Sequence, residues 1–238
     1  MEKIEKQGEE IIFKAKTNES LANAIRRYVN KIPIAAIDEV EIKKNDSFLY
    51  DETLAHRLGL VPLKMTSSIK NNDELKIETK KEGDILSSDL KGDIEVAYDQ
   101  ILISLLNKNQ EIKLTGKIKI GQGEEHSKFS PGLMFYRNIF DIKVEKDCPK
   151  EIVDKCPKKI FKLKDNKIVT ENTQECDLCE SCTEYCILNN KDGLIKITPT
   201  NELKITIESF GQLPPEKIFN SSIKILKKDL EEFSKKLK

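Results

Sequence analysis

All six cysteines of this 238-residue sequence lie between positions 148 and 186. Four of them follow the spacing C-x2-C-x2-C-x3-C, which is formed by Cys176, Cys179, Cys182 and Cys186. Gaps of two residues let a tightly looped backbone direct three thiolates at one iron–sulfur cluster, and this spacing is typical of such sites. The sequence therefore predicts iron–sulfur chemistry in this segment.

A structural zinc site is the main alternative for these cysteines, and a purely structural set of thiols is a second one. Structural zinc sites usually pair two C-x2-C or C-x4-C knuckles that are separated by about a dozen or more residues. Here, three cysteines at intervals of three are followed by one at an interval of four, which suits a cluster better.

The bulk composition describes a globular protein and argues against several classes. The 41 basic and 41 acidic residues cancel, whereas a free-standing nucleic-acid-binding protein usually has a basic excess. No apolar run approaches membrane-spanning length, and residues 1–6 lack the apolar segment of a signal peptide. We therefore expect a cytoplasmic protein, a compartment where clustered cysteines bind metal more often than they form disulfides.

Hydrophobic periodicity predicts an α+β protein. We expect strands over residues 9–16, 34–43, 75–79, 93–97, 101–105, 113–120, 136–144, 194–198 and 203–209. We expect helices over residues 18–31, 51–59 and 214–238. Thr17 or Asn18 can cap the first helix, Gly59 closes the second, and Pro214-Pro215 opens the third.

The last predicted helix carries a narrow apolar seam with the spacing of a heptad repeat. We call the following residues the α-seam: Phe219, Ile223, Leu226, Leu230, Phe233 and Leu237. A helix of about 23 residues is roughly 35 Å long, and one with a single narrow stripe is expected to have a partner helix. The alternative is that it packs only on its own domain.

Several stretches resemble the alpha-type assembly subunit of multisubunit RNA polymerases. They are Asn18–Arg27, Pro33–Asp38 and Leu54–Leu63, in the order of the family. The segment Gly121–Pro131 is similar to the family's G-x-G-x-x-H-x-K-aromatic-x-P signature, and the cysteine segment is similar to the ferredoxin-like iron–sulfur insertion of the family's archaeal form, Rpo3. A lone G-x-G is weak evidence for a phosphate site, and we expect His126 to be structural.

This resemblance implies an alpha-like architecture with a discontinuous dimerisation domain at residues 1–45 and 200–238. It implies a β-rich domain inserted at residues 46–145 and a small ferredoxin-like module at residues 146–199. It also implies a heterodimer with the small subunit L, contact with subunit N, and a platform for the two large catalytic subunits. Those large subunits carry the polymerisation chemistry of transcription, and this sequence has no D-x-D-x-D triad for magnesium.

Two sets of interface residues follow from the resemblance. The helical stripe of Leu21, Ile25 and Tyr28 is expected to join the α-seam in a hydrophobic heterodimer interface. The basic side chains of Arg26, Arg27, His56 and Arg57 are expected to face neighbouring subunits. A solvated helix face is the alternative for the two adjacent arginines. No specific binding of nucleic acid and no membrane contact is expected.

One cluster is expected, of the [4Fe-4S] or [3Fe-4S] type, because only Cys148 and Cys156 stand upstream, where a complete second motif would have four cysteines. In two-cluster ferredoxins the fourth cysteine of each motif completes the opposite cluster. By that rule Cys156, which precedes a proline, joins Cys176, Cys179 and Cys182. Cys148 and Cys186 are then free thiols or a disulfide.

In the competing assignment, Cys186 is the fourth ligand. The cysteine module alone would also suit an iron–sulfur electron-transfer subunit of an oxidoreductase, which is the alternative function. A chain of that kind has no evident need for a long heptad seam.

Overall fold

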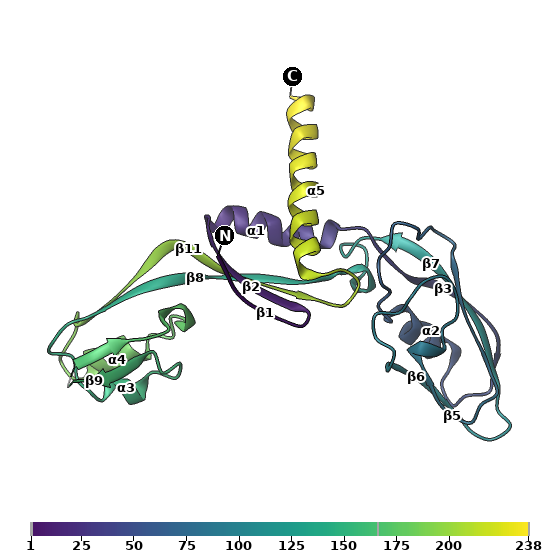
Figure 1. Cartoon of the computed structure of the whole chain (residues 1–238), viewed down its shortest axis with the longest axis horizontal. Helices are drawn as coiled ribbons and strands as arrows, with labels where there is room; N and C mark the ends of the chain where they lie inside the picture. Colours follow the sequence, from purple (N-terminus) through teal and green to yellow (C-terminus); the bar gives the residue numbers. More distant parts are fainter. Residues whose placement is uncertain (1, 166, 238) are drawn as a thin grey trace. The chain divides into compact units, whose positions relative to one another are not determined.

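The structure is a computed structural model that describes residues 2–165 and 167–237. The ends of the predicted domains at residues 1 and 238, and residue 166 of the predicted module, lie outside the described residues. Helices and sheets are both present, which confirms the predicted α+β class. Figure 1 shows the order of these elements along the chain.

The chain divides into two compact units. Unit 1 holds residues up to 5, residues 12–22 and residues 135–206. Unit 2 holds residues 6–11, residues 23–134 and residues from 207 onward. One four-stranded sheet has the strand order β1-β2-β11-β8. The division into three domains that the sequence indicated stays a prediction.

That sheet is made of β1 (Glu2–Gln7), β2 (Glu10–Lys16), β8 (Gly132–Val144) and β11 (Ile195–Ser209). The sequence predicted two strands, over residues 194–198 and 203–209, where β11 runs as one strand that includes Pro199. Proline fixes φ at a value that an extended backbone tolerates, so the strand continues through it. Strand β1 was not predicted, since it has more charged than apolar residues.

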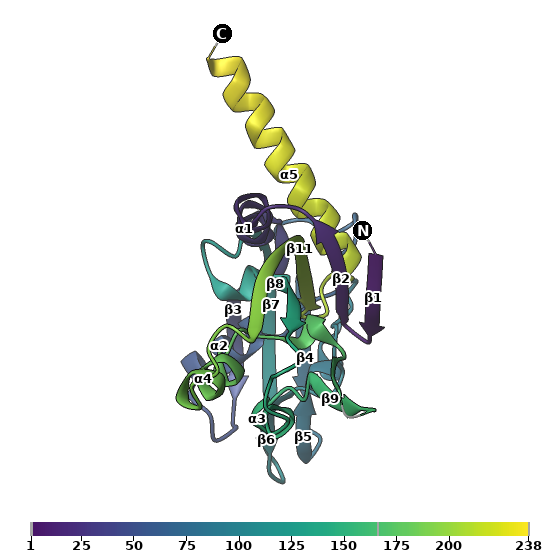
Figure 2. The same ribbon diagram turned by 90° about the vertical axis from the view of Figure 1, so that its left-hand side faces the viewer.

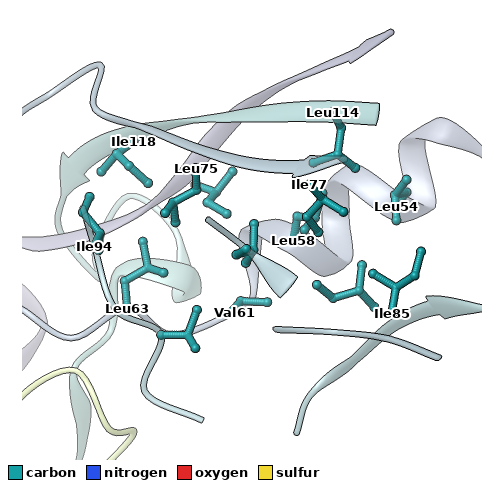
Figure 3. Close-up of a cluster of buried hydrophobic side chains, with 14 of the residues drawn as sticks. Leu54, Leu58, Val61, Leu63, Leu75, Ile77, Ile85, Ile94, Leu114 and Ile118 are labelled. Carbon is teal, nitrogen blue, oxygen red and sulfur yellow. The ribbon is translucent and has the colours of Figure 1, made fainter. Parts of the chain in front are cut away.

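The core of unit 2 lies between a sheet and a short helix. Antiparallel strands β3 (Ile34–Asn45), β7 (Ile112–Gly121) and β4 (Glu74–Thr79) form the sheet. Helix α2 (Asp51–Gly59) contacts β3 and has the predicted bounds. Figure 3 shows Leu54 and Leu58 of this helix in one cluster with Ile77 and Leu114 of the sheet. Strands β5 (Gly83–Leu86) and β6 (Leu102–Leu106) pair beside this core.

The predicted strand over residues 93–97 is wrong. Ile94 and Val96 are buried and alternate with polar residues, which produced the strand pattern. The backbone makes only an isolated bridge between Val96 and Leu63 and does not join a ladder. Strand β5, in contrast, was not predicted from the sequence.

The cysteine segment belongs to unit 1 and lies between β8 and β11 in chain order. It contains α3 (Ile152–Lys155), β9 (Phe161–Lys164), β10 (Lys167–Thr170) and α4 (Ser181–Leu188). Strands β9 and β10 form an antiparallel hairpin. Its core consists of apolar side chains such as Ile152, Ile160 and Phe161 packed with five of the six cysteines.

The first and last helices form as predicted. Helix α1 (Glu19–Tyr28) continues as the 3-10 turn η1 (Val29–Lys31), and the Asn18 side chain accepts a hydrogen bond from the Leu21 backbone N–H at 2.8 Å. Helix α5 (Pro215–Lys236) begins with proline at its first position. Figure 2 shows its C-terminal turns extending beyond the elements of its own unit. No described helix is long and apolar enough to cross a membrane.

Candidate functional site

Four cysteines of unit 1 line one small, mostly enclosed cavity. They are Cys156, Cys176, Cys179 and Cys182, and they share the cavity wall with apolar side chains such as Ile142 and Phe161. These are the four residues that the crossed-ligation rule selects from the sequence. The cavity volume of about 10 Å³ is that of about one water molecule, so the loop would have to open to admit a cluster.

The loop between these cysteines turns sharply. Leu178 and Glu180 both adopt left-handed backbone conformations, with φ of 56° and 60°. These residues alternate with the cysteines and reverse the chain between them, so that the three thiols of the loop face one cavity. Cys156 reaches the same cavity from the end of α3. Left-handed conformations are unfavourable for side chains other than glycine and asparagine, so the rest of the module must hold them.

Burial controls the protonation of these thiols. It raises the pKa of Cys182 to about 11 and also raises the pKa of Cys176. The backbone N–H groups of Leu178 and Thr183 act in the opposite direction on these two sulfurs. A metal binds the thiolate form, so ligation here would release protons and become stronger as the pH rises.

The donor set suits a thiophilic centre. Four thiols around one cavity are soft ligands of the type that iron–sulfur clusters and zinc take. Within residues 2–165 and 167–237, no group of three or more His, Cys, Asp or Glu side chains is arranged so that it could hold a single metal ion. The chemistry of the ligands therefore fits a cluster, whereas their spacing in this structure is not that of a preformed metal site.

Cys148 and Cys186 lie next to each other and do not line the cavity. Both are buried in the same cluster of side chains and are free thiols in this structure. Burial, followed by the nearby Cys186, raises the pKa of Cys148 to about 12. The two cysteines that the sequence set apart from the cluster are thus neighbours.

An ionic network anchors the start of the cysteine loop, and sequence reasoning missed it. The Glu175 carboxylate, immediately before Cys176, accepts hydrogen bonds from Lys204 at 2.6 Å and Arg137 at 2.9 Å. Arg137 belongs to β8 and Lys204 to β11, so one carboxylate joins the loop to both strands. Nothing in the local sequence pairs residues that lie 38 and 29 positions away.

The α-seam changes from buried to exposed along α5. Phe219 is buried, Ile223 and Leu226 are half-buried, and Leu230 and Phe233 are 59% and 61% exposed. Leu237, just beyond the helix, is also exposed. The first two turns of α5 therefore pack within unit 2, while the later turns present an apolar stripe that no described residue covers.

The stripe on α1 is split in the same way. Leu21 is exposed, whereas Ile25 is buried and Tyr28 is half-buried. The Tyr28 hydroxyl donates a hydrogen bond to Asp229 of α5 at 3.0 Å, so the end of α1 is fixed to α5 within the chain. Of the three residues of the predicted stripe, only Leu21 is open to a partner.

The four basic interface candidates have different surroundings. Arg26 and Arg27 are exposed on α1, and Arg26 donates two hydrogen bonds to Asn23 of the same helix. His56 is exposed on α2. Arg57 is half-buried and donates to the Leu102 carbonyl oxygen at 2.5 Å, so its side chain is engaged within the chain.

The Gly121–Pro131 segment is tied to the Pro33–Asp38 stretch. Lys128 forms an ion pair with Asp38 at 2.5 Å and donates to the Ile37 carbonyl oxygen at 3.3 Å. His126 caps the 3-10 turn η3 (Ser127–Phe129) by accepting from the Lys128 backbone N–H. The histidine thus has a local structural contact, and the two sequence stretches meet through an ion pair.

Comparison with known proteins gives consistent matches. Residues 40–140 match the family model described as the RNA polymerase Rpb3/RpoA insert domain. The chain is 30% identical over 240 residues to the DNA-directed RNA polymerase subunit Rpo3 of Archaeoglobus fulgidus, covering 91% of this chain and 89% of that one. It is 30% identical over 255 residues to the subunit Rpo3 of Pyrococcus furiosus, covering 98% and 95%.

A eukaryotic relative extends this pattern. The chain is 28% identical over 278 residues to the DNA-directed RNA polymerase II subunit rpb3 of Dictyostelium discoideum, covering 97% of this chain and 92% of that one. The range matched by the family model contains both the Leu54–Leu63 stretch and the Gly121–Pro131 segment.

Proposed function

The chain belongs to the family of DNA-directed RNA polymerase subunit Rpo3, and on that premise we propose that it is a non-catalytic assembly subunit of the enzyme in the cytoplasm. It pairs with the small alpha-like subunit L, contacts subunit N, and forms a platform for the two large catalytic subunits. The exposed half of the α-seam is the single observation of this structure that supports the pairing.

The physical argument for a partner rests on apolar area. Leu230 and Phe233 lie about one turn apart on α5, and each has more than half of its side chain exposed. A partner helix packed along this stripe would remove the exposed part of both side chains from water, with a gain of about 1–2 kcal/mol for each. Without that partner the stripe is a site for aggregation, so the isolated chain is expected to be poorly soluble.

Co-purification of the chain with subunit L tests the pairing. Leu230→Asp places a charge in the α-seam and should abolish the complex, because a charge buried without a partner costs several kcal/mol. Asn220→Asp is the matched control: it adds the same charge on an exposed position of α5, about 80° or more around the helix from Phe219 and Leu230. Normal recovery of subunit L with Leu230→Asp would show that the interface lies elsewhere.

We propose further that unit 1 holds one iron–sulfur cluster, [4Fe-4S] or [3Fe-4S], through Cys156, Cys176, Cys179 and Cys182. Their shared cavity and the chemistry of four thiols support this set. Such a group supplies a fixed, negatively charged cross-link between the loop and α3, and an electron-transfer centre. Cys148 and Cys186 stay outside the cluster, because neither of them lines the cavity.

Anaerobic cysteine-to-serine variants test this ligand set. Cys156→Ser should lose the cluster absorbance or reduce the iron and sulfide content to that of a three-iron form. Cys148→Ser and Cys186→Ser should keep the cluster. If Cys186→Ser loses the cluster and Cys156→Ser keeps it, the competing assignment is correct. If the anaerobic protein contains stoichiometric zinc and no sulfide, the cluster proposal is wrong and the site is the zinc site of the alternative hypothesis.

The alternative function, an electron-transfer subunit of an oxidoreductase, is not favoured. The matches to polymerase subunits extend over nearly the whole chain, including the parts that contain no cysteine. Affinity purification separates the two functions, because a polymerase subunit should recover the large polymerase subunits and an electron carrier should recover a dehydrogenase.

A further inference from the structure

Unit 2 has a groove beside the N-terminal half of α5 that the proposed pairing does not use. Its volume is about 400 Å³, within the usual range of ligand sites. The apolar part of its lining consists of Ile32, Pro33, Met65, Leu213 and Ile225. The groove lies between α5 and the segment Met65–Ser67.

The wall opposite α5 is held in place by the fold. The Met65 backbone N–H donates to the Gln212 carbonyl oxygen at 2.9 Å, and the Met65 sulfur accepts from the Ala35 backbone N–H at 3.1 Å. Both contacts lie within unit 2. The groove is therefore bounded by anchored backbone on one side and by a helix on the other.

The α5 side of the groove is strongly basic. Lys217, Lys224 and Lys228 all line it, and all three are exposed. Within the part of the chain that the structure describes, Lys217 and Lys224 make no ion pair, and Lys228 makes only an exposed pair with Glu232 at 3.7 Å. An exposed pair of this kind contributes little energy, so the three cations remain available to an anionic partner.

The groove is independent of the α-seam. At 3.6 residues per turn, the three lysines lie on one side of α5, and the centre of the α-seam lies about 180° around the helix. A partner on the α-seam would therefore leave the groove open. The proposal below rests on the proposed function in one respect, which is that the partner is sought within the polymerase.

The spacing of the cations selects the kind of partner. Eleven positions of helix between Lys217 and Lys228 spread the charge over about 16 Å, which is too long for one small anion. The apolar lining requires apolar groups, which a nucleic-acid backbone does not offer. We propose that the groove docks an acidic, amphipathic segment of another polymerase subunit, whose apolar side chains enter the groove and whose carboxylates reach the lysines.

Carbodiimide cross-linking of the intact polymerase tests the docking directly. The reagent joins a carboxylate to a lysine as an amide only when the two are in contact, and mass spectrometry identifies both peptides. We expect amides from Lys217 or Lys224 to aspartate or glutamate residues of one acidic segment in another subunit. The proposal is overturned if neither lysine forms an amide to another subunit while other lysines of the chain do.

Charge reversal gives a second, independent measurement. Lys217→Glu/Lys224→Glu should weaken retention of the cross-linked subunit at least about tenfold in salt-wash titrations of the complex, equivalent to about 1.4 kcal/mol. The matched control is Lys81→Glu/Lys108→Glu, which makes the same change at exposed positions of unit 2 outside the groove, and should have no effect. Equal retention in both variants would refute the docking.

Two further outcomes separate the competing explanations. If a DNA oligonucleotide binds the complex and this binding is lost only in Lys217→Glu/Lys224→Glu, the groove is a nucleic-acid site and the proposal is wrong. If Leu230→Asp fails to release subunit L but the cross-links form, the proposed pairing fails and the groove proposal stands.

Discussion

The ion pair between Asp38 and Lys128 should stabilise unit 2, and Asp38→Asn removes its negative charge with little change in shape. The Lys128 side chain is only 13% exposed, so its ammonium group cannot readily move into water. In the variant the ammonium group would still donate a hydrogen bond to the Ile37 carbonyl oxygen, 3.3 Å away, and could donate one to the side-chain amide oxygen at position 38. The partly buried Lys128 ammonium group would no longer have a negatively charged partner at position 38.

The burial of the two side chains limits how much the free energy of unfolding can fall in Asp38→Asn. Removing one partner of a fully buried pair costs about 3–5 kcal/mol. The Asp38 side chain is 31% exposed and is screened by water, so about 2 kcal/mol is a better value. Replacing both partners, as in Asp38→Asn/Lys128→Met, leaves no unpaired charge. The double variant should therefore be more stable than the sum of the single changes predicts, by about 1–2 kcal/mol.

The pH dependence has a definite sign. The hydrogen bond from Lys128 lowers the pKa of Asp38, and burial opposes this shift. A carboxyl group with a lowered pKa in the folded state contributes its full stability above the ordinary pKa of aspartate, about 3.9, and loses it as the pH falls through the lowered value. Asp38→Asn should lack this part of the acid sensitivity.

Urea unfolding of the chain purified with its partner subunit, followed by circular dichroism at one protein concentration and several pH values, measures both effects. The wild type, the two single variants and the double variant make a complete cycle. Glu39→Gln, at a more exposed carboxylate on the same strand, is the control for a general loss of charge. If Asp38→Asn unfolds at the wild-type urea concentration, or if the cycle shows no coupling, the ion pair does not contribute as its geometry indicates.

Three further predictions concern other parts of the molecule. Gly132→Ala should destabilise unit 2 by about 1–3 kcal/mol in thermal unfolding, because an added Cβ would clash with the Glu208 carbonyl oxygen; an unchanged midpoint would contradict this. Glu175→Gln should cost about 1–2 kcal/mol by removing the charged partner of the buried Lys204, and should speed hydrogen exchange in the cysteine loop; equal exchange rates would show that the network does not hold the loop. The purified heterodimer should bind DNA weakly and in a salt-sensitive manner, because the 238-residue chain has no net charge. Tight binding of DNA at physiological salt would refute this prediction.

Local sequence patterns predicted most of the secondary structure. The capping residue Asn18, the Pro214-Pro215 helix start and the bounds of α2 depend on residues within a few positions of each other, so they can be read without the fold. The strand over residues 93–97 failed for the opposite reason. Alternating burial is local, but a ladder needs a neighbouring strand, and none pairs with this segment beyond one bridge.

The cysteine segment shows the same division. The spacing of Cys176, Cys179 and Cys182 indicated that a short loop could direct three thiols at one place. The sequence left open how α3 and α4 pack, and in the structure Cys156 lines the cavity while Cys186 lies near Cys148; which of the two is a ligand stays a prediction. The Glu175 network could not be foreseen, since its three members meet only after β8 and β11 lie side by side.

The sequence by itself determined that α5 is long and amphipathic, because a heptad spacing of apolar residues is a property of one helix alone. Only the tertiary structure decided how this surface is divided: Phe219 is buried within unit 2, whereas Leu230 and Phe233 remain exposed. It also decided that Lys217, Lys224 and Lys228 border a groove, because the opposite wall comes from Met65, far away in the chain. Burial and grooves arise from contacts between distant segments, and such contacts leave no periodic signal in the sequence.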